Sequence, residues 1–168
     1  MDKEALSALQ GPLKERYRAD ATAAVITLRA TGRLGEGVTC SLDTGRAMAE
    51  AGLHPGAGGD GSQLCSGDLL LEALVACAGV TLKAVATSLE LDVRGGTVRA
   101  EGDLDFRGTL AVDRQAPVGF TAIRLTFEVE TDASAEQLAT LEKLTERYCV
   151  VWQSLQHPPE GSVTIRSD

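Results

Sequence analysis

The sequence predicts a single α+β domain with an antiparallel sheet and the element order ββ-α-ββ-α-β. Three observations predict it. Several short segments alternate apolar and polar residues with a period of two, which is typical of half-buried strands. A run of helical length at residues 68–91 is apolar around nearly its whole circumference, and residues 134–155 repeat leucines at helical spacing. The length of 168 residues suits one hydrophobic core.

The first strands are expected as a hairpin near the N-terminus of the domain. Residues 24–31 and 38–42 alternate, and the glycine-rich segment 32–37 is expected to make the turn with Arg33 at its tip. Later alternation predicts strands at three further places, residues 98–106, 123–130 and 163–166. We expect residues 1–21 to form a separate N-terminal helical extension and residues 22–168 to form the domain.

A glycine-rich connection at residues 45–63 contains the spacing G-x-G-x-x-G from Gly56 to Gly61. In dinucleotide-binding proteins this motif follows a strand and opens a helix within a βαβ unit. No strand is expected before it here and no βαβ unit surrounds it. The segment is therefore interpreted as a loop.

The apolar helix at residues 68–91 is expected to begin after Ser66, which can serve as its N-cap, with Asp68 in the first turn. It is too apolar all round to be covered by one small sheet, so we expect a homodimer. Glu72, Thr81 and Lys83 interrupt the run, and no membrane span is expected.

The second helix has a clear beginning and end in the sequence. Ser134 and Gln137 have the spacing of a capping box, and His157-Pro158-Pro159 is expected to end the helix. Between them, apolar residues recur at helical spacing, and Cys149 and Trp152 fall on the apolar side. This predicts one continuous helix packed on the sheet.

Charge and composition exclude some partners. The net charge of −8 at pH 7 argues against nucleic acids and anionic membranes, which are polyanions. The charged start of the chain has no signal-peptide pattern, so we expect a cytoplasmic protein.

In a reducing compartment the four cysteines (Cys40, Cys65, Cys77 and Cys149) are buried fillers, metal ligands or redox-active thiols. Their spacing does not favour a zinc site, and no cofactor is expected.

Two segments carry a resemblance to a known family. Residues 69–77, which lie on the buried helix and include Cys77, resemble the first-cysteine helix of the OsmC/Ohr proteins (osmotically inducible protein C and organic hydroperoxide resistance protein). Residues 147–155 resemble their second-cysteine segment around Cys149. The resemblance spans roughly residues 22–166 and identifies the chain as a divergent member.

The resemblance implies an OsmC-like fold and an intertwined homodimer with two long helices at its centre. It also implies reduction of organic hydroperoxides. Cys77 would attack the peroxide and become a sulfenic acid, Cys149 would resolve it as a disulfide, and an external dithiol would reduce the disulfide.

Some family positions differ in this chain. Gly67 stands where the family has a glutamate that orients a catalytic arginine, and Asp68 is the nearest carboxylate able to replace it. Val150 stands where the family has a proline. Arg33 best matches the family's arginine, with Arg29 and Arg46 as alternatives, and Cys40 and Cys65 are interpreted as bystanders.

The residues leave other functions open. The apolar face around Cys77 fits a peroxide pocket and a plain core equally well. A non-catalytic protein of the same fold that binds a small apolar ligand is one alternative. A redox sensor, in which disulfide formation changes the shape presented to a partner, is another.

Overall fold

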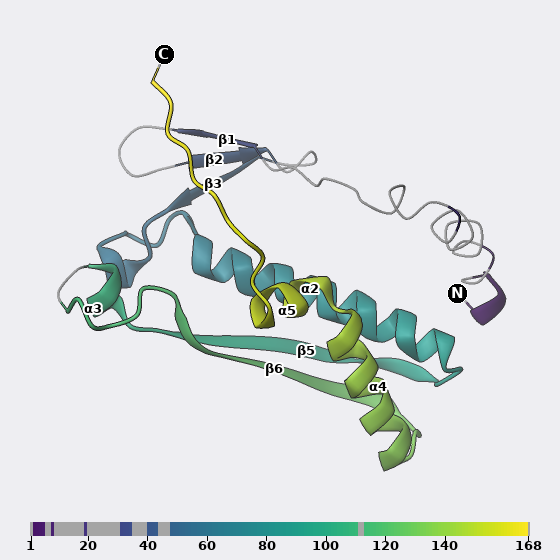
Figure 1. The fold of residues 1–168 in the computed structure, drawn as a ribbon. Helices are drawn as coiled ribbons and strands as arrows, with labels where there is room; N and C mark the ends of the chain where they lie inside the picture. The colour runs from purple at the N-terminus through teal and green to yellow at the C-terminus, as the bar shows by residue number, and fades with distance from the viewer. Residues whose placement is uncertain are drawn as a thin grey trace.

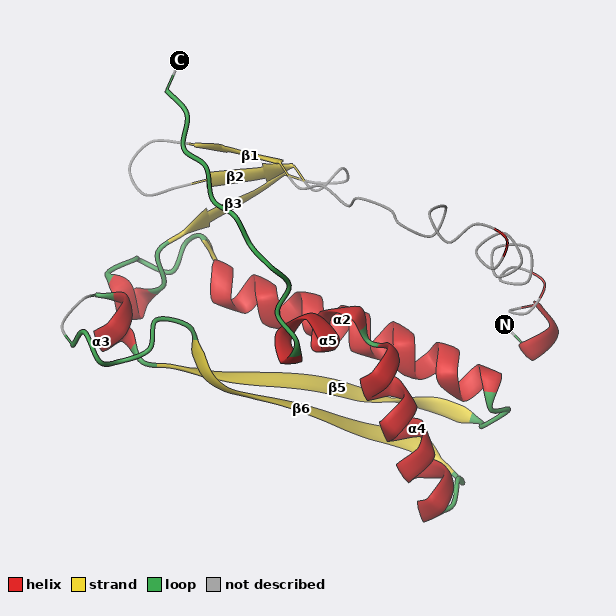
Figure 2. Cartoon of the chain, in the orientation of Figure 1, coloured by secondary structure: helices red, strands yellow, loops and turns green. Residues whose placement is uncertain are grey.

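The computed structural model describes residues 2–5, 8, 19, 31–34, 40–43, 48–110 and 113–167. Among these residues, helices and strands alternate along the chain as an α+β fold (Figures 1 and 2). The strands are β1 (Thr31–Leu34), β2 (Cys40–Asp43), β3 (Met48–Gly52), β4 (Leu64–Cys65), β5 (Val93–Leu104) and β6 (Phe120–Thr131). The helices are the 3-10 turn η2 (Pro55–Ala57), α2 (Ser66–Ser88), α3 (Phe106–Thr109), α4 (Ala135–Tyr148) and α5 (Val150–Gln156).

The long hairpin of β5 and β6 forms the base of the core. Its two strands pair antiparallel, with Val98 opposite Phe127 and Ala100 opposite Leu125. Because side chains alternate between the two faces of a strand, these apolar residues all point to one face. Helix α2 lies along that face, and α4 and α5 pack against α2 (Figure 1).

Helix α2 buries only one of its sides within the chain. Its buried residues are spaced three or four apart and form one stripe, which consists of Leu74, Ala78, Leu82, Val85 and Ala86. Val80, on the uncovered side, is 73% exposed. The helix is long and apolar enough to cross a membrane, with a mean hydropathy of 1.9, but core helices pass the same test, and 28% of that window is buried here.

The core has two parts along α2. One part joins the C-terminal half of α2 to the start of β5 and to α4, through Leu82, Val85, Val93 and Leu141. The other joins the middle of α2 to the junction of α4 and α5, through Leu74, Ala78 and Cys149. Phe127 of β6 packs against both parts. The second part contains the two cysteines that the sequence singled out.

The N-terminal sheet differs from its prediction. It has four strands in the order β1-β2-β3-β4, and its first pairing joins β1 to β2 with Arg33 opposite Ser41. Arg33 is therefore inside a strand and not at the tip of the hairpin, because Gly32 continues the extended chain through the expected turn. Residues 24–30 and the predicted extension 1–21 lie mostly or wholly outside the described residues, as do Arg29 and Arg46.

The connection at residues 45–63 also contains a strand that the sequence did not predict. Strand β3 pairs antiparallel with β2, with Ala51 opposite Cys40, and parallel with the short β4. Its sequence, Met48 to Gly52, has weak strand propensity, so pairing with its neighbours on both sides determines its conformation. After β3 comes the turn η2 and not a helix of a βαβ unit, in agreement with the interpretation of Gly56–Gly61 as a loop.

The helix boundaries are partly as predicted. The capping box is confirmed, since Ser134 accepts from the Gln137 N–H and the Gln137 side chain accepts from the Ser134 N–H. Ser66 is not the N-cap of the first helix: Cys65, with ψ of 132°, holds that position. The prediction of one continuous second helix is also wrong, because Cys149, with ψ of 106°, separates α4 from α5.

The predicted last strand is absent from the described chain. Residues 158–167 have no regular structure, and Val163 and Ile165 are 93% and 94% exposed. An extended segment becomes a strand only when a neighbouring strand accepts its hydrogen bonds. The described part of one chain brings no such neighbour to it.

Candidate active site

Cys77 and Cys149 meet where the middle of α2 packs on the junction of α4 and α5. Cys149 is completely buried with Leu74 and Ala78, and the partly buried Cys77 packs against the same group. The two thiols are near enough that each shifts the pKa of the other. The structure thus brings together two residues that are 72 positions apart in the sequence.

The break between the helices determines how this contact is made. The Cys149 N–H ends α4 by donating to the Thr145 carbonyl at 3.0 Å, and the Cys149 carbonyl begins α5 by accepting from Gln153 at 2.9 Å. Val150 and Val151 are the first residues of α5, where N–H groups have no partner within the helix. Both N–H groups lie near the sulfur of Cys77 and lower its pKa.

The surroundings of Cys77 favour its thiolate. Burial by itself would raise the pKa of this thiol. Hydrogen bonds from the Val151 N–H, the Cys149 thiol, the Val150 N–H and the Thr81 hydroxyl outweigh burial, and they hold the pKa of Cys77 below its ordinary value. All of these donors stabilise the negative charge on the sulfur.

Cys149 behaves in the opposite way. Burial raises the pKa of the Cys149 thiol above its ordinary value, and the neighbouring Cys77 raises it further. Hydrogen bonds from the Trp152 and Val151 N–H groups only partly offset these effects. Of the two sulfurs, Cys77 therefore gives up its proton first, and Cys149 keeps its proton as the donor.

The described residues of the structure do not bring the other predicted site residues to Cys77 and Cys149. Asp68 is exposed in the first turn of α2 and forms no ion pair with any described residue. Because the helix is regular from Ser66, nine positions place Asp68 on the side opposite Cys77. Whether Asp68 orients an arginine stays a prediction. The side chain of Arg33 lies outside the described part of the structure, so its role stays a prediction.

The remaining cysteines and the histidines lie elsewhere. Cys65 is a free thiol at the N-cap of α2, and Cys40 is in β2. His54 stacks on Phe106 with ring centroids 5.1 Å apart, and its Nδ1 accepts from the Gly56 N–H. Within the described residues, no three His, Cys, Asp or Glu side chains are grouped to hold a metal ion.

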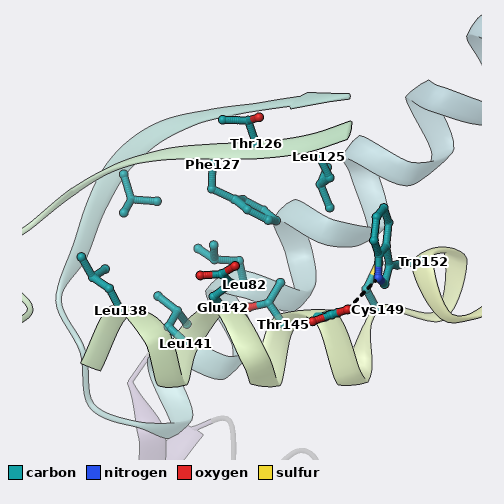
Figure 3. A pocket seen from close by; sticks show the side chains of 12 residues that line it. Leu82, Leu125, Thr126, Phe127, Leu138, Leu141, Glu142, Thr145, Cys149 and Trp152 are labelled. Carbon is teal, nitrogen blue, oxygen red and sulfur yellow. Dashed lines mark hydrogen bonds between the residues drawn. The ribbon is translucent and has the colours of Figure 1, made fainter. Parts of the chain in front are cut away.

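A cavity of about 480 Å³ opens beside Cys149, between α4, β6 and α2. Cys149 and Trp152 lie at one end of it and Leu138 lies at the other (Figure 3). The indole Nε1 of Trp152 donates to Glu146 at 3.3 Å. The twelve lining residues are Leu82, Leu125, Thr126, Phe127, Val129, Leu138, Leu141, Glu142, Thr145, Glu146, Cys149 and Trp152.

Sequence reasoning missed several contributors to the site. The N–H groups of Val150 and Val151 carry no side-chain signal, because they are available only through the helix break at Cys149. The sequence places Thr81 one turn after Cys77 on the same face of α2, but that face was interpreted only as apolar. Its hydroxyl could have been found from that spacing.

Comparison with known proteins identifies the family. A sequence model of the family described as OsmC-like protein matches residues 59–164, which is more than half of the chain. The chain belongs to the OsmC-like protein family. No curated protein matches its sequence. The match includes both Cys77 and Cys149, so the resemblance drawn from the two cysteine segments is confirmed.

Solved structures confirm that this OsmC-like chain has the OsmC fold. An OsmC-like protein from Mycoplasma pneumoniae superposes with a TM-score of 0.67 at 15% identity, covering 79% of this chain and 89% of that one. An organic hydroperoxide resistance protein from Elizabethkingia anophelis gives 0.64 at 17% identity, covering 80% and 91%. An organic hydroperoxide resistance protein OsmC from Legionella pneumophila gives 0.62 at 15% identity, covering 79% and 91%.

Proposed function

We propose that this OsmC-like protein reduces organic hydroperoxides with Cys77 as the attacking thiol and Cys149 as the resolving thiol. The observation that carries the proposal is the packing of Cys77 against the buried Cys149, together with the opposite pKa shifts of the two groups. A peroxidatic thiol needs to be a thiolate, and its resolving partner needs to be within reach. Membership of the family supports the same chemistry.

The reaction has two steps within the protein. The Cys77 thiolate attacks the terminal peroxide oxygen, the O–O bond breaks, and the alkoxide that leaves takes up a proton to become an alcohol. Cys77 is then a sulfenic acid. The sulfur of Cys149 next attacks the sulfur of Cys77, so that the disulfide forms and the hydroxyl leaves as water. An external dithiol supplies two electrons and two protons to restore both thiols.

The proposal includes a homodimer in the cytoplasm. The apolar side of α2 that is open in one chain, including the 73% exposed Val80, supports a second copy as its cover. A reducing compartment supports the thiol cycle, because the disulfide is then a temporary state. The net charge of −8 supports the expectation that neither nucleic acid nor an anionic membrane is a partner.

The two cysteines are expected to fail differently when replaced, which tests the proposal. Cys77→Ser should abolish the reaction of purified protein with cumene hydroperoxide. Cys149→Ser should consume about one equivalent and stop as a sulfenic acid that dimedone traps. The wild-type protein should form the Cys77–Cys149 disulfide and turn over with added dithiothreitol. Peptide mapping that finds both thiols reduced after excess hydroperoxide would instead support the binding-protein alternative.

A further inference from the structure

The main-chain carbonyl of Glu146, in the last turn of α4, has a side chain as its partner. In an uninterrupted helix this carbonyl would accept from the N–H group of Val150, four residues later. It accepts instead from Nε2 of Gln153 at 2.9 Å. On either side of it the bonds stay within the main chain, since the Cys149 N–H donates to the Thr145 carbonyl and the Gln153 N–H to the Cys149 carbonyl. A side-chain amide thus replaces one main-chain donor at the end of α4.

The replacement leaves the Val150 N–H group available to another acceptor. Cys149, with ψ of 106°, takes the chain out of α4, and Val150 begins α5, where an N–H group has no partner within the helix. The N–H groups of Val150 and Val151 lie near the sulfur of Cys77 and lower its pKa. If α4 continued through Val150, the Glu146 carbonyl would accept this N–H group and Cys77 would lose it.

The residue types around the break do not impose it. Sharp helix breaks usually occur at proline or glycine, and residues 148–156 contain neither. Valine is only mildly unfavourable within a helix and retains its N–H group. The break at Cys149 therefore depends on the contacts made across it, and the bond from Gln153 to the Glu146 carbonyl directly spans it.

Other contacts hold the start of α5 in the same position. The indole Nε1 of Trp152 donates to the Glu146 side chain at 3.3 Å, so α5 makes two bonds to one residue of α4. Val151 and Trp152 also pack against the buried group of Leu74, Ala78 and Cys149, which includes the middle of α2 (Figure 1). The first turn of α5 is thus fixed between α4 and the helix that carries Cys77.

We propose that Gln153 is a positioning residue for Cys77: its side-chain amide occupies the Glu146 carbonyl and so keeps the Val150 N–H group directed to the Cys77 sulfur. Gln153 acts only through Val150 and touches no reacting atom. Its contribution to peroxide reduction rests on the proposed function. Its effect on the ionisation of Cys77 does not, because a thiol titrates whether or not a peroxide is present.

Replacing Gln153 by methionine tests the proposal, because methionine is similar in length but has no N–H donor. Loss of a donor to the thiolate should raise the pKa of Cys77 and slow its alkylation by iodoacetamide at pH 7 by roughly two- to tenfold, the factor of one hydrogen bond. The measurement follows the Cys77 peptide across a pH series. Gln153→Ala should give the same direction of change, and Gln156→Met, at the exposed last residue of α5, is the matched control and should keep the wild-type profile.

A double variant tests whether Gln153 acts through Val150. Val150→Pro removes the N–H group at position 150 and cannot continue α4, so the Glu146 carbonyl has no main-chain donor left to exclude. We therefore expect Gln153→Met to shift the alkylation profile in the wild-type background and to add no further shift to Val150→Pro. A side chain that only stabilised α5 would shift both backgrounds alike or neither.

Two results would overturn the positioning role. One is a wild-type alkylation profile in a Gln153→Met protein that far-UV circular dichroism shows to be folded. The other is an equal shift on adding Gln153→Met to the wild type and to Val150→Pro. The alkylation contains no peroxide, so a Gln153→Met shift in a protein whose Cys77 is never oxidised by cumene hydroperoxide would overturn the proposed function and leave the positioning role intact.

Discussion

Cys77 packs against the completely buried Cys149, and this contact connects the middle of α2 with the break between α4 and α5. It brings the two thiols near enough for each to shift the pKa of the other. It also couples their protonation, because the donor must keep its proton for the acceptor to lose its own. Both halves of the proposed cycle depend on this one contact.

Replacing Cys149 by alanine or by serine separates the hydrogen bond from the disulfide. Both variants lack a resolving sulfur, but serine retains an O–H donor and alanine does not. We expect the pKa of Cys77 to be higher in Cys149→Ala than in Cys149→Ser, because only serine keeps a donor beside the sulfur of Cys77. The measurement is the pH dependence of Cys77 alkylation by iodoacetamide, followed on the Cys77 peptide. Superposed profiles would mean that the Cys149 thiol does not tune Cys77.

Replacing Val150 by proline tests whether the Val150 N–H group lowers the pKa of Cys77. Val150 is the first residue of α5, is 69% exposed and follows an extended residue, so proline fits this position and removes only its N–H group. Val150→Pro should raise the pKa of Cys77 and slow alkylation below about pH 8, while Val150→Ala should keep the wild-type profile. Far-UV circular dichroism controls for an intact α5. An unchanged pKa in a folded Val150→Pro protein would remove this N–H group from the site.

A charge on the open side of α2 tests the homodimer. Val80→Glu should give a monomer in sedimentation velocity at micromolar concentration, because a carboxylate buried at an apolar interface lacks a partner. Val118→Glu is the matched control, since Val118 is 65% exposed in the loop before β6 and should leave the dimer unchanged. Wild-type protein that sediments as a folded monomer would contradict the prediction.

The buried hydroxyl of Thr145 should lower the free energy of unfolding of the wild-type protein. Valine has nearly the same shape as threonine but lacks the hydroxyl that is buried without a partner. We therefore expect Thr145→Val to increase the free energy of unfolding by about 1 kcal/mol in the absence of ligand. Urea titration monitored by Trp152 fluorescence measures this change, with Thr140→Val as the control. A destabilised Thr145→Val protein would mean that the hydroxyl has a bonding partner in solution.

Patterns of side chains predicted much of the fold and the identity of the thiol pair. The alternation in β5 and β6, the capping box at Ser134 and the apolar run of α2 are local signals, and each one was confirmed. The position of Arg33, the strand β3 and the break at Cys149 were not predicted. They depend on pairing between distant segments and on backbone geometry, which residue types do not encode locally.

The sequence predicted only part of the site. Cys77 and Cys149 could be paired through the family resemblance, but an arginine was expected to activate the thiol. Among the described residues, the groups that lower the pKa of Cys77 are main-chain N–H groups, a thiol and a hydroxyl, and the role of the arginine stays a prediction. Main-chain donors are the same for every residue type except proline, so no pattern of side chains predicts them.

The separation of the two cysteines along the chain has a consequence for synthesis. Helix α2 packs on β5, and β5 pairs with β6, so these contacts can form as soon as the hairpin has emerged from the ribosome. Cys149 is made 72 residues after Cys77, which corresponds to roughly 4–14 s of translation at 5–20 residues per second. Under the proposed function, each nascent chain therefore passes through an interval in which Cys77 has no resolving partner, and a sulfenic acid formed then is open to irreversible oxidation.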